Sequence, residues 1–104
     1  MKIEIRKSYY PNGKLFSETP YKNGIRHGIR KFYYENGNIE FKIPYVNDLR
    51  HSIRKHYHPN GILLSEIPYK NGKKHGIRKY YYENGNIKSS IIYINNRRYG
   101  ILYK

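Results

Sequence analysis

Residues 30–53 read RKFYYENGNIEFKIPYVNDLRHSI, and residues 78–101 read RKYYYENGNIKSSIIYINNRRYGI. These two stretches agree at 14 of 24 positions, and the blocks that precede them, 6–29 and 54–77, agree with each other at 17 of 24. Self-similarity at a fixed period is the signature of a repeat architecture. We therefore interpret residues 1–104 as a single domain of four 24-residue repeats, 6–29, 30–53, 54–77 and 78–101.

Asparagine marks the turns of every repeat. It stands at residues 12, 23, 36, 47, 60, 71, 84 and 95, and glycine follows it at six of these places. Asn-Gly between apolar-rich runs predicts a β-hairpin, because both residues tolerate a positive φ. The sequence therefore predicts an all-β fold, a single-layer antiparallel β-meander of about four hairpin repeats. With no helix to cover it, such a sheet should curl over itself or pair with a second copy to bury one face.

The type of turn decides which side chains share a face of the sheet. A two-residue Asn-Gly loop pairs odd-numbered residues with even ones, whereas a three-residue loop with a bulged glycine pairs odd with odd. Of the 25 Ile, Leu, Val, Phe and Met residues 17 are odd-numbered, and of the 21 Lys and Arg residues 15 are even-numbered. We favour the three-residue loop, because it alone separates an apolar face from a basic one; a one-residue slip is the alternative.

This register makes specific predictions about burial. The apolar face should bury a column of isoleucines, Ile29, Ile53 and Ile77. The same face should carry two columns of tyrosines as its core, Tyr21, Tyr45, Tyr69 and Tyr93 with Tyr9, Tyr33, Tyr57 and Tyr81. The opposite face should expose Arg30, Arg54 and Arg78.

Composition limits the class of protein. The net charge of +14 is extreme for 104 residues and indicates an anionic partner. There is no cysteine, no run of 18 apolar residues and no apolar signal segment in MKIEIRKSYYPNG. We therefore expect a cytoplasmic protein.

Catalysis is not expected. Of the seven acidic residues, Glu35 and Glu83 fall in turns, and Glu18 and Glu66 occupy equivalent positions four strands apart, so no carboxylate pair is expected at the 5–9.5 Å separation that glycosidases need. His27, His51 and His75 form a column, but neighbours two strands apart lie roughly 9–10 Å from each other and cannot easily share one metal ion. We expect each histidine to pack beside its turn, and we predict no metal and no cofactor.

The basic face is the candidate binding site. Arg side chains bind phosphate through two hydrogen bonds, and aromatic rings between them can stack on bases. The predicted polyanion-binding residues are Arg26, Arg30, Arg50, Arg54, Lys74, Arg78 and Arg98, with Tyr34, His58 and Tyr82 as aromatic neighbours. The alternative is a solvated surface that only keeps the protein soluble.

The turn sequences resemble the MORN repeat, and more closely its bacterial variant. YYPNGKL (9–15) with YKNGIRHG (21–28), and HPNGIL (58–63) with YKNGKKHG (69–76), carry the resemblance, whereas YVNDLRHS and YINNRRYG depart from it. The resemblance implies a β-hairpin repeat fold. It also implies phospholipid binding, scaffolding or dimerisation for MORN arrays in general, and an antitoxin role for stand-alone bacterial variants.

Three functions remain open at this point. The first is an inhibitor that binds RNA, another nucleic acid or a nucleic-acid-handling protein complex, as an antitoxin or a phage-encoded, anti-CRISPR-like blocker of host defence would. The second is a scaffold on anionic phospholipid, which attracts basic residues at about 1 kcal/mol each. The third is a protein–protein module that forms a homodimer or docks on an acidic partner.

Overall fold

The computed structural model describes residues 2–103, and the burial of side chains within residues 2–101. Between Lys2 and Tyr103 the chain forms twelve strands and no helix, so this part of the chain has no helix that could cross a membrane. The strands are β1 (Ile3–Tyr9), β2 (Leu15–Lys22), β3 (Ile25–Arg26), β4 (Gly28–Tyr33), β5 (Ile39–Val46), β6 (Leu49–Arg50), β7 (Ser52–Tyr57), β8 (Leu63–Lys70), β9 (Lys73–Lys74), β10 (Gly76–Tyr81), β11 (Ile87–Ile94) and β12 (Arg97–Tyr103).

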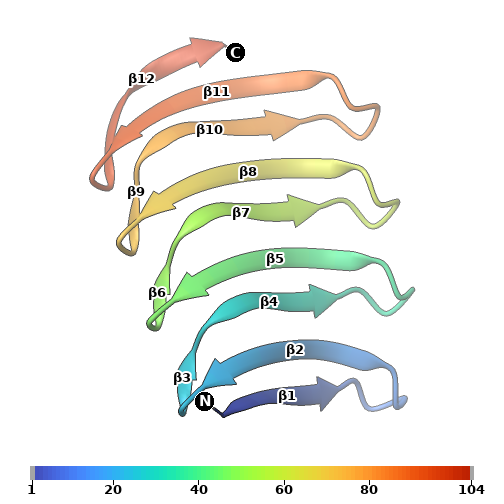
Figure 1. Ribbon diagram of the computed structural model, residues 1–104. Helices are drawn as coiled ribbons and strands as arrows, with labels where there is room; N and C mark the ends of the chain where they lie inside the picture. Colours follow the sequence, from blue (N-terminus) through green and yellow to red (C-terminus); the bar gives the residue numbers. More distant parts are fainter. Residues whose placement is uncertain (1, 104) are drawn as a thin grey trace.

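All strands belong to one antiparallel sheet in the order β1-β2-β4-β5-β7-β8-β10-β11-β12, and the short strands β3, β6 and β9 pair with β2, β5 and β8. Figure 1 shows the hairpins stacked one above another from the N-terminus to the C-terminus, with no second layer over the described residues. The predicted all-β, single-layer meander of hairpin repeats is confirmed. The sheet is open, with β1 and β12 at its edges.

The loops at one end of the hairpins, after β1, β4, β7 and β10, contain three residues. In the first repeat, Tyr10 N donates to Lys14 O (2.8 Å) and Gly13 N donates to Tyr10 O (2.9 Å), which encloses Pro11, Asn12 and Gly13. Gly13 has a φ of 88°, a conformation that glycine adopts without a steric penalty. The same backbone bonds recur at 34–38, 58–62 and 82–86. The predicted three-residue loop is therefore confirmed at this end of the hairpins.

The loops at the other end of the hairpins, after β2, β5, β8 and β11, contain two residues. Asn23 and Gly24 both have positive φ, 52° and 81°, and Lys22 pairs with Ile25 across them. This is the type I′ geometry that matches the twist of the flanking strands. The equivalent loops, Asn47-Asp48, Asn71-Gly72 and Asn95-Asn96, also have two positive φ angles. The prediction of three-residue loops at every turn is therefore wrong at this end of the hairpins.

A β-bulge shifts the register once more in each hairpin. Ser8 pairs with Ser17 and Tyr9 with Leu15, so Phe16 lies between them without a partner. The shift recurs between Phe32 and Tyr33, between His56 and Tyr57, and between Tyr80 and Tyr81. Beyond each bulge, even-numbered residues pair with odd-numbered ones. The one-residue slip that the sequence left open is thus part of the fold.

The two faces mix residues that odd and even numbering had separated. Arg30, Arg54 and Arg78 lie directly opposite Ile43, Ile67 and Ile91 on the neighbouring strands. We call this side the arginine face; it takes the even-numbered residues of β4, β7 and β10 and, beyond the bulge, the odd-numbered residues of β2, β5, β8 and β11. The other side, which carries Lys31, Lys55 and Lys79, is the lysine face.

The predicted burial is reversed as a result. Ile29, Ile53 and Ile77 lie on the lysine face and are 48%, 40% and 42% exposed, whereas their neighbours Arg30, Arg54 and Arg78 are half-buried. The buried side chains of the arginine face are Ser17, Thr19, Ile43, Tyr45, Ser65, Ile67 and Tyr69. The tyrosines also divide: the Tyr33 hydroxyl reaches Glu18 on the lysine face, so its column does not share a face with that of Tyr45.

Consecutive repeats are held together by one recurring side-chain hydrogen bond. The hydroxyl of Tyr10 donates to Tyr33 O (2.6 Å), and that of Tyr34 donates to Tyr57 O (2.5 Å). At the equivalent position of the third repeat, His58 Nε2 lies 3.1 Å from Tyr81 O. These bonds join each long loop to the strand of the next repeat, and they add to the backbone pairing between repeats.

Candidate polyanion interface

The seven predicted cations lie on a single face of the sheet. Arg30, Arg54 and Arg78 occupy the middle of β4, β7 and β10. Arg26, Arg50, Lys74 and Arg98 follow the two-residue loops, where they pair with Tyr21, Tyr45, Tyr69 and Tyr93. Because the repeat period of 24 is even and each repeat contains two register reversals, the bulge and the two-residue loop, equivalent residues stay on one face. The result is two columns of positive charge along the arginine face.

Aromatic rings support these cations. The guanidinium carbon of Arg30 lies 4.6 Å from the ring centre of Phe32, that of Arg54 lies 4.6 Å from Phe41, and that of Arg78 lies 4.5 Å from Tyr80. In the second column, Arg26 lies over Tyr45 (4.4 Å), Arg50 over Tyr69 (5.4 Å) and Lys74 over Tyr93 (5.2 Å). Such cation–π contacts hold each charge in a defined place on the sheet.

Tyr45 is at the centre of the most cationic part of this face. Its hydroxyl lies 3.3 Å from Arg26 Nη1, and its side chain is only 5% exposed. Burial by itself raises the pKa of Tyr45, yet this pKa lies below its ordinary value, because hydrogen bonds to Arg50 and Arg30 and the charge of Arg26 favour the phenolate. Cations from three strands therefore act on one buried hydroxyl.

Little negative charge compensates these arginines. Among the described residues, the two ion pairs are Arg6 with Glu4 (2.9 Å) and Arg26 with Asp48 (2.5 Å). The Nε atoms of Arg30, Arg54 and Arg78 are buried without a hydrogen-bond partner. Burial lowers the pKa of Arg54 below its ordinary value, and the charges of Arg50 and Arg78 lower it further against the opposing effect of Tyr69. An anion at this face would relieve that repulsion.

The three aromatic residues predicted for the site lie at its margin. Tyr34 and His58 contribute their polar atoms to the bonds between repeats, so their rings have fixed positions beside the long loops. Tyr82, the equivalent residue of the last repeat, is 50% exposed. The sequence predicted these three residues as stacking partners on the side of the turns, and the structure places them beside the long loops.

The rings that lie beside the arginines come from both even-numbered and odd-numbered positions. Phe41 stacks on His56 with ring centres 4.1 Å apart, and a chain of edge-to-face contacts joins Phe41 to Phe32 and Phe16. Phe41, Tyr45 and Tyr69 had been predicted to lie on the opposite face. The different composition of the two loop types, Pro-Asn-Gly or Glu-Asn-Gly against Asn-Gly, Asn-Asp or Asn-Asn, was the available signal for the change of register.

The histidine column and the acidic residues do not form a reactive cluster. In the part of the chain that the structure describes, no three His, Cys, Asp or Glu side chains could hold one metal ion. His75 Nδ1 lies 3.4 Å from Asn95 N, so it packs beside a turn, whereas His51 is exposed. Glu18 and Glu66 accept hydrogen bonds from Tyr33 (2.6 Å) and Tyr81 (3.0 Å) of the next repeat.

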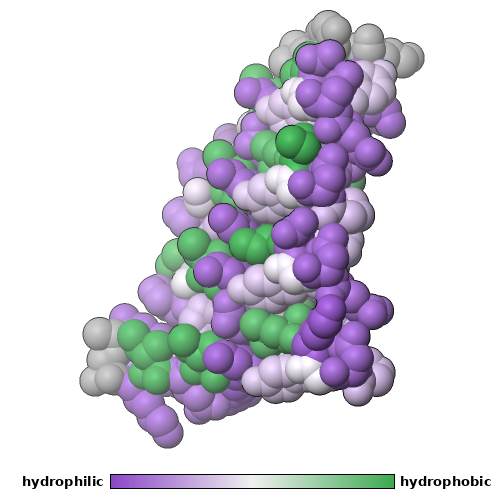
Figure 2. Space-filling view, turned by 90° about the vertical axis from the view of Figure 1, so that its right-hand side faces the viewer, coloured by the Kyte–Doolittle hydropathy of each residue, from purple (hydrophilic) through white to green (hydrophobic). Residues whose placement is uncertain are grey.

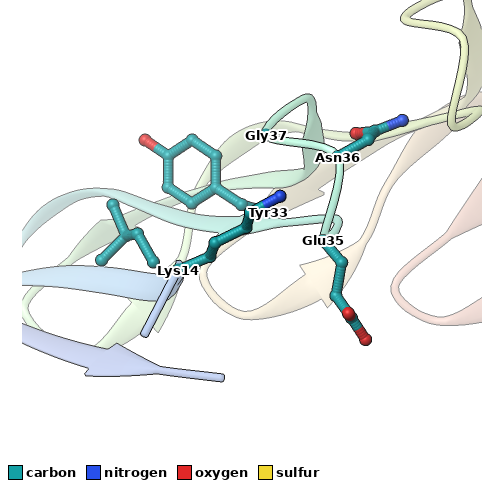
Figure 3. A pocket seen from close by; sticks show the side chains of 6 residues that line it. Lys14, Tyr33, Glu35, Asn36 and Gly37 are labelled. Atoms are coloured by element: carbon teal, nitrogen blue, oxygen red, sulfur yellow. The ribbon is translucent and has the colours of Figure 1, made fainter. Parts of the chain in front are cut away.

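Two shallow pockets recur between neighbouring long loops, on the lysine face. The first, of about 360 Å³, is lined by Lys14, Leu15, Tyr33, Glu35, Asn36 and Gly37 (Figure 3). The second, of about 320 Å³, is lined by Gly37, Asn38, Ile39, Lys42, Tyr57 and Gly61. Tyr57 and Ile39 of the second pocket are the repeat equivalents of Tyr33 and Leu15 of the first. These pockets follow from the repeat and contain no catalytic constellation.

The sheet is open, and one of its faces carries two columns of cations. This arrangement is that of a repeat protein that presents an extended surface rather than an enclosed site. The model of the MORN repeat variant matches residues 5–23, 26–47, 50–71 and 74–95, which together make up most of the chain. The chain therefore belongs to the MORN repeat variant family. No curated protein matches it.

Proposed function

We propose that this chain is a non-enzymatic binding protein whose arginine face engages a polyanion, and that the polyanion is RNA or the nucleic acid of a protein complex. Within the family, this would place the chain in a bacterial, antitoxin-like branch of inhibitors or among anti-CRISPR-like blockers of host defence. The observation that carries the proposal is the pair of cation columns with almost no carboxylates between them.

The chemistry of these columns suits a phosphate backbone. Guanidinium groups bind phosphate oxygens through two hydrogen bonds, and the rings beneath them fix the direction in which they point. Equivalent arginines are two strands apart, roughly 9–10 Å. The sheet has no helix in the described residues to enter a groove, so we expect recognition of the backbone and of shape rather than of base sequence.

The salt dependence of RNA binding tests this proposal. Binding of a labelled single-stranded RNA should weaken steeply with salt, with a log–log slope near −0.7 for each phosphate engaged. Replacing Arg30, Arg54 and Arg78 with Gln should reduce that slope by about 2 units and weaken binding at low salt. The melting temperature of the triple variant must be measured first, because these side chains are half-buried.

A matched control lies one residue further along each strand. Lys31, Lys55 and Lys79 carry the same charge in the same repeats but lie on the lysine face. Their replacement with Gln should leave the slope nearly unchanged. If the two triple variants lose affinity equally, only net charge matters and the arginine face is not the site. Vesicles of anionic phospholipid that bind when RNA does not would favour the lipid alternative.

A further inference from the structure

The lysine face carries an exposed apolar stripe that the proposed RNA site does not use. It consists of one isoleucine each from β1, β4, β7 and β10, namely Ile5, Ile29, Ile53 and Ile77, which are 58%, 48%, 40% and 42% exposed. Opposite them on the longer strands lie Pro20, Pro44, Pro68 and Ile92. Proline and isoleucine side chains that continue from strand to strand form one apolar surface, and such surfaces mark interaction sites. Figure 2 looks at the molecule from the side of the long loops, where apolar groups also recur at intervals among hydrophilic ones.

Cations flank the stripe on both sides. On the side of the long loops, the next row across the sheet contains Lys7, Lys31, Lys42, Lys55 and Lys79. The row on the side of the two-residue loops is mixed: it contains the cations Lys22, Lys70, Lys73 and Arg97 and the exposed apolar residues Ile25, Val46, Leu49 and Ile94. The acids of the first row, Glu18 and Glu66, already accept hydrogen bonds from Tyr33 and Tyr81. An occupant of the stripe therefore meets a row of lysines along the margin nearer the long loops, and a mixed row of cations and apolar residues along the other margin.

A notch lies within the stripe where the hairpin of β4 and β5 meets β7. It has a volume of about 290 Å³ and is lined by Ile29, Lys42, Pro44, Ser52, Ile53 and Lys55. Two isoleucines and a proline form its apolar wall, and two lysines stand at its rim. The notch can take an aliphatic side chain while the two lysines, which are cross-strand neighbours on its long-loop side, contact a carboxylate beside it.

We propose that the apolar stripe of the lysine face is the docking surface for an acidic protein segment in which Asp or Glu residues alternate with aliphatic ones. The occupant is a protein because aliphatic side chains fit the notch, and isoleucine and proline offer no ring on which a base could stack. It is not a second copy of this chain, because the same lysine rows would then face each other. A twisted sheet also presents only part of such a stripe to a flat lipid surface, whereas an extended segment can follow it.

The probe is a fluorescent peptide of about twelve alternating Leu and Glu residues, which at roughly 3.3 Å per residue spans about 40 Å. Nine strands about 4.8 Å apart give the stripe a similar length. The peptide should bind the full chain, and replacing Ile29 and Ile53 with Ser should weaken binding by about tenfold or more. The control is Ile62→Ser, since Ile62 is 39% exposed but lies in a loop away from the stripe. Binding of RNA should not change in either variant.

A second pair of variants keeps the test independent of the isoleucines. Replacing Lys42 and Lys55 with Gln should also weaken binding of the peptide, although the isoleucines and the proline of the notch remain. Equal binding of a peptide in which Ser replaces Leu, or no binding of the Leu–Glu peptide up to about 1 mM, would overturn the proposal. So would a dimer in sedimentation that Ile53→Ser dissociates, or anionic vesicles that bind the stripe when the peptide does not. Loss of RNA binding alone would concern only the arginine face.

Discussion

Ile67, which is 2% exposed, lies directly opposite Arg54 on the neighbouring strand, so the best-buried apolar side chain of the described residues and a half-buried cation share one face. The Arg54 guanidinium lies over Phe41 on its other side. The hydrophobic core and the candidate binding surface are therefore the same side of a single sheet. Stability and binding can still be tested separately, because the arginines of β4, β7 and β10 alternate across the sheet with the isoleucines of β5, β8 and β11.

Isoleucines on the two faces should respond very differently to truncation. Ile67→Ala should lower the free energy of unfolding by about 2–5 kcal/mol, because it leaves a cavity among packed neighbours. Ile53→Ala should cost about 1 kcal/mol or less, since Ile53 is 40% exposed. Urea denaturation measures both. Equal costs would mean that the lysine face is covered in solution.

The bond between repeats can be tested with single hydroxyl groups. Tyr34→Phe removes the donor to Tyr57 O and should cost about 1 kcal/mol. For a domain of this size that corresponds to a fall in melting temperature of about 4–8 °C. Tyr82→Phe is the matched control at the same position of the last repeat, where the side chain is 50% exposed, and it should change little. A similar loss in both variants would argue against this interpretation.

The Tyr33 phenol should lose its proton at a higher pH than an ordinary tyrosine. Burial and then the hydrogen bond to Glu18 raise the pKa of Tyr33 to about 12. Because the folded pKa is above the unfolded value near 10, the stability that this raised pKa confers is complete below about pH 10 and is lost as the pH rises towards 12. Difference absorbance between wild type and Tyr33→Phe isolates this phenol. Glu18→Gln should move its midpoint down towards 10; an unchanged midpoint would leave burial as the whole cause.

His56 should make the protein less stable in mild acid. Burial lowers the pKa of His56 below its ordinary 6.5, and the charges of Arg54 and His58 lower it further. The unfolded chain then binds a proton more readily than the folded one, so stability is present above about pH 6.5 and falls as the pH drops below it. His56→Phe introduces the residue found at the equivalent Phe32 and should flatten the dependence of melting temperature on pH between about 7 and 5. An equally steep fall in the variant would assign the effect to other groups.

Much of the candidate site followed from the sequence because equivalent residues stay together. A period of 24 is even, so Arg30, Arg54 and Arg78 share a face whenever each repeat contains an even number of register reversals: none as the sequence predicted, two in the structure. The aromatic partners did not follow. Phe41 reaches Arg54 only because the bulge and the two-residue loop each reverse the relation between odd and even residues. Counting residues along the chain, without those two reversals, placed Phe41 on the opposite face.

The sequence by itself determined the repeat, the positions of the turns and the all-β class, because Asn-Gly favours positive φ within a few residues of chain. Only the tertiary structure decided which side chains are buried. Register depends on hydrogen bonds between strands, and those bonds form when the neighbouring hairpin is in place. Ile53 and Arg54 show the consequence: adjacent in the chain, they lie on opposite faces, and the pairing of Arg54 with Ile67 places the arginine, not the isoleucine, on the side with the core.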